Sequence, residues 1–283
     1  TSSETDMHQE NYPMAQRDKI IQWMNQYLQT DRFKDFSPIG LQIEGKPTVR
    51  KIATGVSASM ELFRQAARWG ADMVVVHHGM FWEREDRVLQ GHLKQRVRIL
   101  LDNDMTLAGY HLPLDAHPEI GNNILFANAM GFADIKPFGE YHGMFIGYQG
   151  KLKPIRIGDF VRKAAHFYEI QILKSSQPAK AAFAPDSPAN LRTFLHGRPT
   201  ITSAAIVSGG AWDEMLQATH LGIDCFVTGS ADEPAFNLAR EEKIHFVSFG
   251  HYATERVGIR ELGKMVAKEF GVEAKFFDVE NPL

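Results

Sequence analysis

Residues 53–78 read ATGVSASMELFRQAARWGADMVVVHH, and this stretch decides the organisation of the chain. It predicts an apolar strand, a turn of small residues, an amphipathic helix over about 59–69, and a second strand that follows Gly-x-Asp. Residues 205–228, AIVSGGAWDEMLQATHLGIDCFVT, show the same order at an offset of 152 and without a gap. The helix expected in this second stretch covers about 211–221. The chain therefore contains an internal repeat.

The second halves of the two stretches also correspond. A strand is expected over 105–108 and another over 244–248, and each runs into a His-x-x-x-acid motif. The motifs are His111-Leu-Pro-Leu-Asp115 and His251-Tyr-Ala-Thr-Glu255. A helix is expected after each motif.

Both of these helices carry start and stop signals. The first is expected over 118–130, with Pro118 at its first position and Gly131 just past its end. The second is expected over about 254–270, where Thr254 is the predicted N-cap and Gly271 the stop.

Strands that alternate with helices indicate an α/β fold. We expect two similar α/β domains that arose by duplication. The first repeat spans 15–135, a connector with the start of the second domain spans 136–200, and the second repeat spans 201–283. Within the connector, alternating apolar residues over 136–158 predict strands, and the prolines of 175–200 predict loops.

The composition is that of a soluble globular protein. Of 283 residues, 44% are hydrophobic and 23% charged, and the formal net charge of −3 gives no electrostatic reason to expect nucleic-acid binding. The single cysteine, Cys225, cannot form an internal disulfide, which favours a reducing compartment. No apolar run is long enough to span a membrane, and residues 1–10 lack the apolar centre of a signal peptide. A cytoplasmic location is expected.

Adjacent histidines, His77 and His78, end the apolar run of 73–76. Because neighbouring side chains on a strand point to opposite sides, this pair can serve two metal ions, or one ion and one supporting contact. The competing interpretation is one structural histidine beside an accidental neighbour.

The two His-x-x-x-acid motifs add further imidazoles and carboxylates, the ligand types of Zn, Fe, Mn or Ni. Pro113 indicates that residues 111–115 form a loop rather than a helical turn. Glu255 is expected in the first turn of its helix, where a carboxylate can bridge two cations. As an alternative, both acids are ordinary helix-start residues.

Other candidate site residues are expected to have structural roles. His117 precedes Pro118 and is expected to be a helix-capping or surface residue. Ser208-Gly209-Gly210 can bind an anion through backbone N–H groups, but a plain tight turn is favoured because no phosphate-binding motif follows. The remaining histidines have no partner pattern: His8, His92, His142, His166, His196, His220 and His245.

Together, the motifs resemble the NIF-three-like family of dinuclear metal centre proteins, whose bacterial members carry the label "GTP cyclohydrolase I type 2 homologue". The resemblance runs from about residue 15 to the end and is loose over about 136–200. It implies two similar α/β domains, a two-metal site between them and a ring-shaped homohexamer. The matching segments are Gly40–Gly45, Val76–Gly79, His111–Pro118, Gly121–Asn123 and Gly250–Arg256.

The resemblance also implies roles for individual residues. His78 and Asp115 would bind one ion, His77 and His251 the other, and Glu255 would bridge both. The catalytic candidates are Glu255 and His111, the latter as a neighbouring group that carries protons. In the family a Thr-Gly-Glu sequence often stands where this chain has Thr228-Gly229-Ser230, so the role of that glutamate is in doubt here.

Two classes of function follow. The first is a metal-dependent hydrolase that activates water between two divalent ions, in the manner of a GTP cyclohydrolase, on an unidentified small molecule. The second is a metal-binding scaffold or regulatory interaction protein without catalysis. Neither the metal nor the substrate is selected by the sequence.

Overall fold

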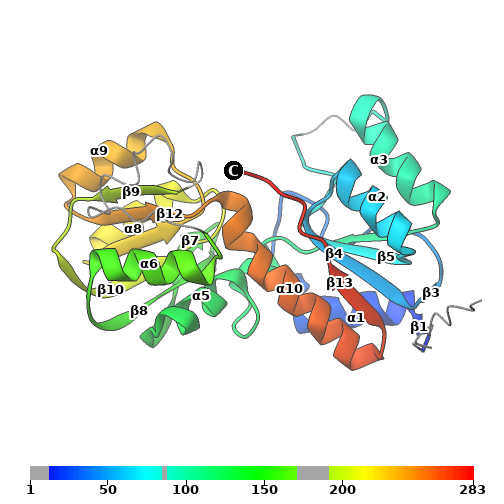
Figure 1. The fold of residues 1–283 in the computed structure, drawn as a ribbon, viewed down its shortest axis with the longest axis horizontal. Helices are drawn as coiled ribbons and strands as arrows, with labels where there is room; N and C mark the ends of the chain where they lie inside the picture. Colours follow the sequence, from blue (N-terminus) through cyan, green and yellow to red (C-terminus); the bar gives the residue numbers. More distant parts are fainter. Residues whose placement is uncertain (1–12, 85–87, 171–190) are drawn as a thin grey trace, which may run out of the picture.

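The computed structural model describes residues 13–84, 88–170 and 191–283. Two β-sheets lie side by side, each covered by helices, and the long helix α10 (His251–Phe270) runs from one towards the other (Figure 1). The expected α/β class and the two α/β domains are confirmed. Among the helices of these described residues, none is both long and apolar enough to cross a lipid bilayer.

The first sheet has the strand order β13-β4-β5-β6-β2. Its centre, β13 to β6, is parallel, and β2 is added antiparallel to β6. The strands are β13 (Glu273–Phe276), β4 (Lys51–Ser57), β5 (Met73–His78), β6 (Thr106–Gly109) and β2 (Gly40–Ile43). A separate two-stranded pair joins β1 (Ala15–Gln16) to β3 (Thr48–Val49).

The run of valines in β5 is buried because helices cover both faces of this sheet. Val74 and Val76 pack with residues of α2 (Met60–Trp69) and α3 (Gly91–Asp102). Met73 and Val75 face the other core, formed with α1 (Arg17–Tyr27) and α10. A continuous apolar strand is what a parallel sheet covered on both sides requires.

The second sheet has the order β7-β8-β10-β11-β12-β9. Its parallel centre, β10 to β12, is flanked by antiparallel strands. The strands are β7 (Ala133–Tyr141), β8 (Met144–Arg156), β10 (Thr200–Ile206), β11 (Cys225–Thr228), β12 (His245–Ser248) and β9 (Arg192–Leu195). One face packs on α5 (Asn122–Met130) and α6 (Ile157–Phe167), and the other on α8 (Met215–His220) and α9 (Glu233–Glu241).

The duplication is visible in matching hydrogen bonds. Asp72 accepts backbone N–H bonds from Arg50 at 2.8 Å and Lys51 at 3.2 Å through Oδ2. At the offset of 152 residues, Asp224 accepts bonds from the backbone N–H groups of residues 202 and 203 at 2.8 and 3.1 Å. In each repeat the aspartate of Gly-x-Asp thus ties the start of its strand to the neighbouring strand.

The C-terminal segment returns to the first sheet, which the repeat pattern does not indicate. β13 pairs with β4, and Ile259, Leu262 and Val266 of α10 are buried in the core of the first domain. In Figure 1 the α10 ribbon and the β13 strand reach the side of β4 and α1. The boundaries at 136 and 201 stay a prediction from the sequence. In the structure, residues 251–276 of the second repeat pack against the first domain.

Three local predictions need correction. The helix expected from Pro118 begins at Asn122, and the one expected after Thr254 begins at His251 with Gly250 as its N-cap residue. Gly250 adopts φ 100°, a conformation that β-carbon-bearing residues avoid, so the strand can turn directly into the helix. The expected stops, Gly131 and Gly271, are confirmed as left-handed C-caps.

The third correction concerns Pro113, which does not prevent a helix. Leu112–Ala116 forms the short helix α4, with Pro113 in its first turn. A proline is tolerated there because its missing N–H would have no partner within the helix. Strands over 136–158 are confirmed by β7 and β8. Residues 1–10 and most of the expected proline-rich loop lie outside the described residues.

Candidate metal centre

The two adjacent histidines lie at the carboxyl end of β5, with their rings 4.8 Å apart. The Nδ1 atom of His77 is 2.9 Å from the backbone oxygen of Tyr110, and Nδ1 of His78 is 3.1 Å from Oγ of Ser57. The hydrogen bond at Nδ1 leaves Nε2 of each ring free to face the space between the two sheets. This is how metal-binding histidines are usually fixed.

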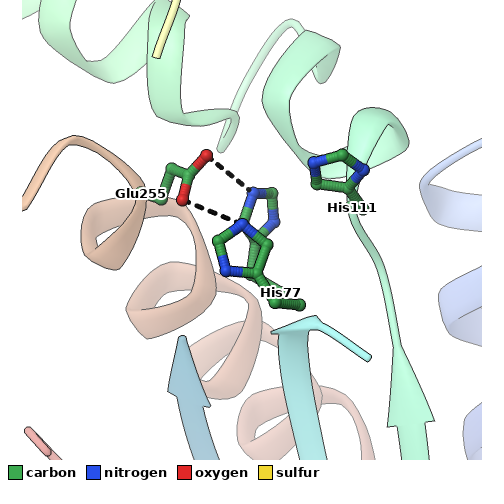
Figure 2. A group of neighbouring side chains, drawn as sticks. His77, His111 and Glu255 are labelled. Carbon is green, nitrogen blue, oxygen red and sulfur yellow. Dashed lines mark ion pairs between the residues drawn. The ribbon is translucent and has the colours of Figure 1, made fainter. Parts of the chain in front are cut away.

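Glu255 lies opposite this pair, on the first turns of α10, and only 2% of its side chain is exposed. Its Oε1 is 3.5 Å from Nε2 of His77, and its Oε2 is 3.0 Å from Nε2 of His78. Figure 2 shows the carboxylate reaching from the helix towards the end of the strand. The two oxygens thus face different histidines.

His251 lies one turn before Glu255 on α10, and its Nε2 is 3.2 Å from Oε2 of that glutamate. Residues four apart share a helix face, which explains why this motif delivers two ligands together. Ser230, which stands where the family often has glutamate, has its Oγ 3.4 Å from Nδ1 of His251. Ser230 therefore contacts His251 at the ring nitrogen that does not face Glu255.

Asp115 completes the group from helix α4. Its Oδ2 is 3.4 Å from Nε2 of His77. Its Oδ1 accepts hydrogen bonds of 2.8 Å from Oγ of Ser208 and from Nδ2 of Asn122. The carboxylate is therefore held by one oxygen and presents the other to the histidine.

His111 approaches from the opposite side, and its ring lies 5.0 Å from that of His77 (Figure 2). Its Nδ1 is 2.9 Å from Oδ1 of Asp35, whose other oxygen accepts the backbone N–H of Leu112 at 2.9 Å. The side chains of His77, His78, His111 and Glu255 offer ligand atoms that all lie within 4.8 Å of one another.

The loop after β10 closes the site from the second sheet. Gly209 has φ +71°, and a β-carbon there would lie 2.3 Å from Oε1 of Glu255. The backbone oxygen of Gly209 accepts N–H bonds from Gly229 and Ser230 at 2.9 and 3.0 Å. These bonds tie the loop to the end of β11, and glycine is required at 209 by both conformation and space.

Burial and neighbouring charges shift the pKa values of the candidate ligands. Burial lowers the pKa of His77, but the carboxylates of Asp115 and Glu255 outweigh it and raise that pKa well above its ordinary value. For His251, the charge of Glu255 is the main cause of a raised pKa. Burial dominates at His78 and lowers its pKa. Burial would raise the pKa of Glu255, but the surrounding histidines hold it well below the usual range.

The donor set fits metal ions. The Nε2 atom of His77 and the Oε2 atom of Glu255 are buried without a hydrogen-bond partner among the described residues, although opposite charges lie close by. Ligand atoms about 2.0–2.1 Å from one ion lie roughly 3.0–3.4 Å from each other, which is close to the observed separations of 3.0–3.5 Å. The candidate ligand atoms are thus spaced as the ligands of a shared ion would be.

A cavity of about 750 Å³ opens onto this group between the two domains. It is lined by residues of both sheets, including His78, His111, Asp115, His251 and Glu255. Aromatic side chains line it beside the histidines: Phe36, Trp82 and Tyr141. There is room for a small molecule next to the candidate ligands.

The structure brings together all the residues that the sequence singled out as ligands or proton carriers. Nε2 of His77 lies near Asp115 and near Oε1 of Glu255, whereas Nε2 of His78 and Nε2 of His251 both lie near Oε2 of Glu255. The pairing implied by the resemblance, His78 with Asp115 and His77 with His251, stays a prediction.

His117 lies outside the site, as expected, although it is buried. Its Nε2 is 3.0 Å from the backbone oxygen of Tyr27, and its Nδ1 accepts N–H bonds from Glu119 and Ile120. It therefore holds the turn before α5.

The sequence-based reasoning missed Asp35 and did not assign a supporting role to Ser57, Asn122 or Ser208. Ser208 was considered only as part of a possible anion-binding turn, and Asn122 belongs to one of the segments that match the family.

Comparison with known proteins decides the family. The family model described as "Duf34/NIF3 (NGG1p interacting factor 3)" matches residues 15–282. The chain belongs to the NIF3 family. Curated relatives of this NIF3-family chain include a "GTP cyclohydrolase 1 type 2 homolog" of Haemophilus influenzae, 38% identical over 93% of this chain and 98% of that protein. A protein of the same name from Neisseria meningitidis is 38% identical over 95% of this chain and 100% of its own length.

Solved structures agree with this membership. The structure described as "Structural genomics, protein ybgI, unknown function" is 35% identical, covers 95% of this chain and 100% of its own, and has a TM-score of 0.80. The crystal structure of TTHA1606 from Thermus thermophilus is 28% identical with a TM-score of 0.79, over 95% of this chain and 100% of that one. The NIF3 fold thus extends over nearly the whole chain.

Proposed function

We propose that this NIF3-family protein is a metal-dependent hydrolase that holds two divalent cations between its domains. The observation that carries the proposal is the convergence of three histidines and two carboxylates on one buried point, where Nε2 of His77 and Oε2 of Glu255 make no hydrogen bond among the described residues. Burying such polar atoms without a hydrogen bond is costly unless something binds them.

The family resemblance supplies an assignment of ligands. His78 and Asp115 would hold one cation, His77 and His251 the other, and Glu255, which contacts all three of these histidines, would contribute to both. Cations at these positions, when bound, would polarise the scissile group and bring the pKa of a water molecule towards neutrality.

The chain's own residues supply the rest of the chemistry. His111 would move a proton between water and the leaving group, because its Nδ1 is fixed by Asp35 and its ring faces the histidines. The Asp35 carboxylate would stabilise the positive charge that the imidazole acquires. Ser208 and Asn122 would keep one oxygen of Asp115 engaged and the other turned inward.

The relatives' name brings GTP into consideration as a substrate. The test is elemental analysis of the purified protein together with a hydrolysis panel of GTP, phosphoesters and cyclic amides. We expect about two transition-metal ions per chain and turnover of at least one member. Variants His77→Ala and Glu255→Ala should lose both metal and turnover, and exposed His92→Ala should keep both.

The second candidate function, a non-catalytic metal-binding scaffold, is favoured by a different outcome. Two ions in the wild-type protein, lost in His77→Ala, but no turnover of any substrate in the panel would reject the hydrolase and leave the scaffold.

We also propose the homohexamer that the family resemblance implies. Light scattering coupled to size-exclusion chromatography should give six times the mass of one chain, and a monomer would refute the proposal.

A further inference from the structure

The cavity beside the metal centre contains a positive charge that the proposed chemistry does not use. Arg96, on helix α3, is the single arginine or lysine among the described residues that line it. Its Nε is buried and has no hydrogen-bond partner in the described part of the chain. Burying a guanidinium N–H without an acceptor is costly, so this partly exposed side chain is available to an acceptor from outside the chain.

Other partly buried arginines in the described residues show the usual arrangement. Arg17 pairs with Glu44 at 2.9 Å, and Arg256, whose Nε is also buried without a hydrogen bond in the described residues, pairs with Glu169 at 2.9 Å. Arg96 takes part in none of the ion pairs found among the described residues. Its lack of a carboxylate therefore distinguishes it from the structural arginines.

The acidic residues of the cavity do not neutralise it. Asp213 and Glu214 also line the cavity, but they come from the second domain. Glu214 is bonded to the side chain of Gln217 instead. Asp115 and Glu255 also line the cavity, and Arg96 forms no ion pair with any of these carboxylates among the described residues.

The part of the cavity next to the histidines has flat apolar surfaces. The ring of Trp82 lies 5.9 Å from that of His78 and 5.2 Å from that of His111. Phe36 and Tyr141, 5.8 Å apart, line the same cavity. Aromatic faces of this kind bind planar rings.

We propose that Arg96 is the anchor for an anionic group, phosphoryl or carboxylate, on a ring-containing substrate whose ring lies against Trp82. A guanidinium donates two parallel N–H bonds to either kind of oxyanion. The volume of about 750 Å³ accommodates a ring together with such a group. This proposal rests on the proposed hydrolase function, because it names the class of substrate. Anion binding itself can be measured without turnover.

Isothermal titration with phenyl phosphate, benzoate and neutral benzamide tests the proposal on the chelator-treated protein, so that no cation binds the probes. We expect at least one anionic probe to bind tenfold or more tightly than benzamide, and the tighter anion identifies the group. Arg96→Gln should remove this preference, and Arg96→Lys should keep part of it. The matched control is Arg98→Gln, an exposed position on the same helix, which should bind as the wild type does.

Equal affinity for anionic and neutral probes in the wild type, or unchanged anion binding in Arg96→Gln, would overturn the proposal. Far-ultraviolet circular dichroism of each variant shows that it is folded, and Arg96→Lys supplies the comparison if Arg96→Gln is not. Because these titrations contain no metal and involve no hydrolysis, they fail independently of the experiments on His77 and Glu255.

Discussion

At the scale of single residues, the site depends on the hydrogen bonds made behind its histidines. Asp35 is the clearest case, because its side chain is fully buried and it accepts bonds from both His111 and the backbone of Leu112. Burial would raise the pKa of Asp35, but the bond and charge of His111 hold it below the usual range. Asp35 is therefore negative at neutral pH.

We expect Asp35→Asn to weaken the fold and to release His111. The loss of charge-assisted hydrogen bonds should lower the free energy of unfolding by about 1–3 kcal/mol, measured by urea denaturation at pH 7. Turnover of any substrate found in the panel should fall tenfold or more, while metal content stays near the wild-type value. Exposed Asp31→Asn on the neighbouring turn is the control, and equal effects of the two variants would contradict the role of Asp35.

The raised pKa values of His77 and His251 predict how metal binding depends on pH. Ligand imidazoles must lose their protons, so protons compete with the cation below these raised values. We expect the apparent affinity to fall as pH decreases from 8 to 6, by about tenfold per pH unit for each proton displaced. Competition with a chromophoric chelator measures this. His251→Ala should reduce the slope, and a flat profile would contradict proton competition.

At the scale of secondary-structure elements, helix α10 carries the second half of the site and packs tightly to do so. A β-carbon at Gly258 would lie 2.7 Å from Oδ1 of Asn122, which accepts the backbone N–H of Gly258 at 2.8 Å. The same asparagine donates to Asp115 at 2.8 Å. Asn122 thus links the close contact between α10 and α5 to the candidate ligand Asp115.

Gly258→Ala should therefore disturb both stability and the metal centre. Alanine favours helix formation, but the clash with Asn122 should outweigh this and cost about 1–3 kcal/mol of unfolding free energy. We also expect weaker metal binding, because displacing Asn122 frees Asp115. Lys264→Ala, at an exposed position of the same helix, should change neither property. If Gly258→Ala binds metal as tightly as the wild type, the contact between α10 and α5 does not support the metal site.

The elements also show what the sequence could predict. Strands β5, β11 and β12 were predicted closely, because buried parallel strands read as short apolar runs. Strand β13 was missed, since Glu273–Phe276 is short and half polar and is defined by its pairing with β4. Asp35 and Arg96 were missed for a related reason. Nothing near them in the sequence indicates that the fold brings them to the histidines.

At the scale of the whole molecule, the candidate ligands connect elements that are remote in sequence. His77 and His78 end a strand of the first sheet, while the loop at Gly209 belongs to the second sheet. Glu255 joins them from α10, which packs on the core of the first domain. Because no single stretch contains the full set, only the folded chain presents it, and a metal ion bound there would stabilise that state.

Metal removal should therefore lower the thermal stability of the protein, and more so at high pH. With free cation a hundredfold above Kd, binding adds about 2.7 kcal/mol, which corresponds to a Tm shift of roughly 5 °C for a chain of this size. Without metal, the raised pKa values of His77 and His251 give stability that is fully present below about pH 6.5 and is lost as pH rises through those values. Differential scanning calorimetry at pH 6 and 8 should show a larger drop after chelation at pH 8. His77→Ala should show little change on chelation at either pH, and a drop equal to wild type in that variant would place the stabilising metal elsewhere.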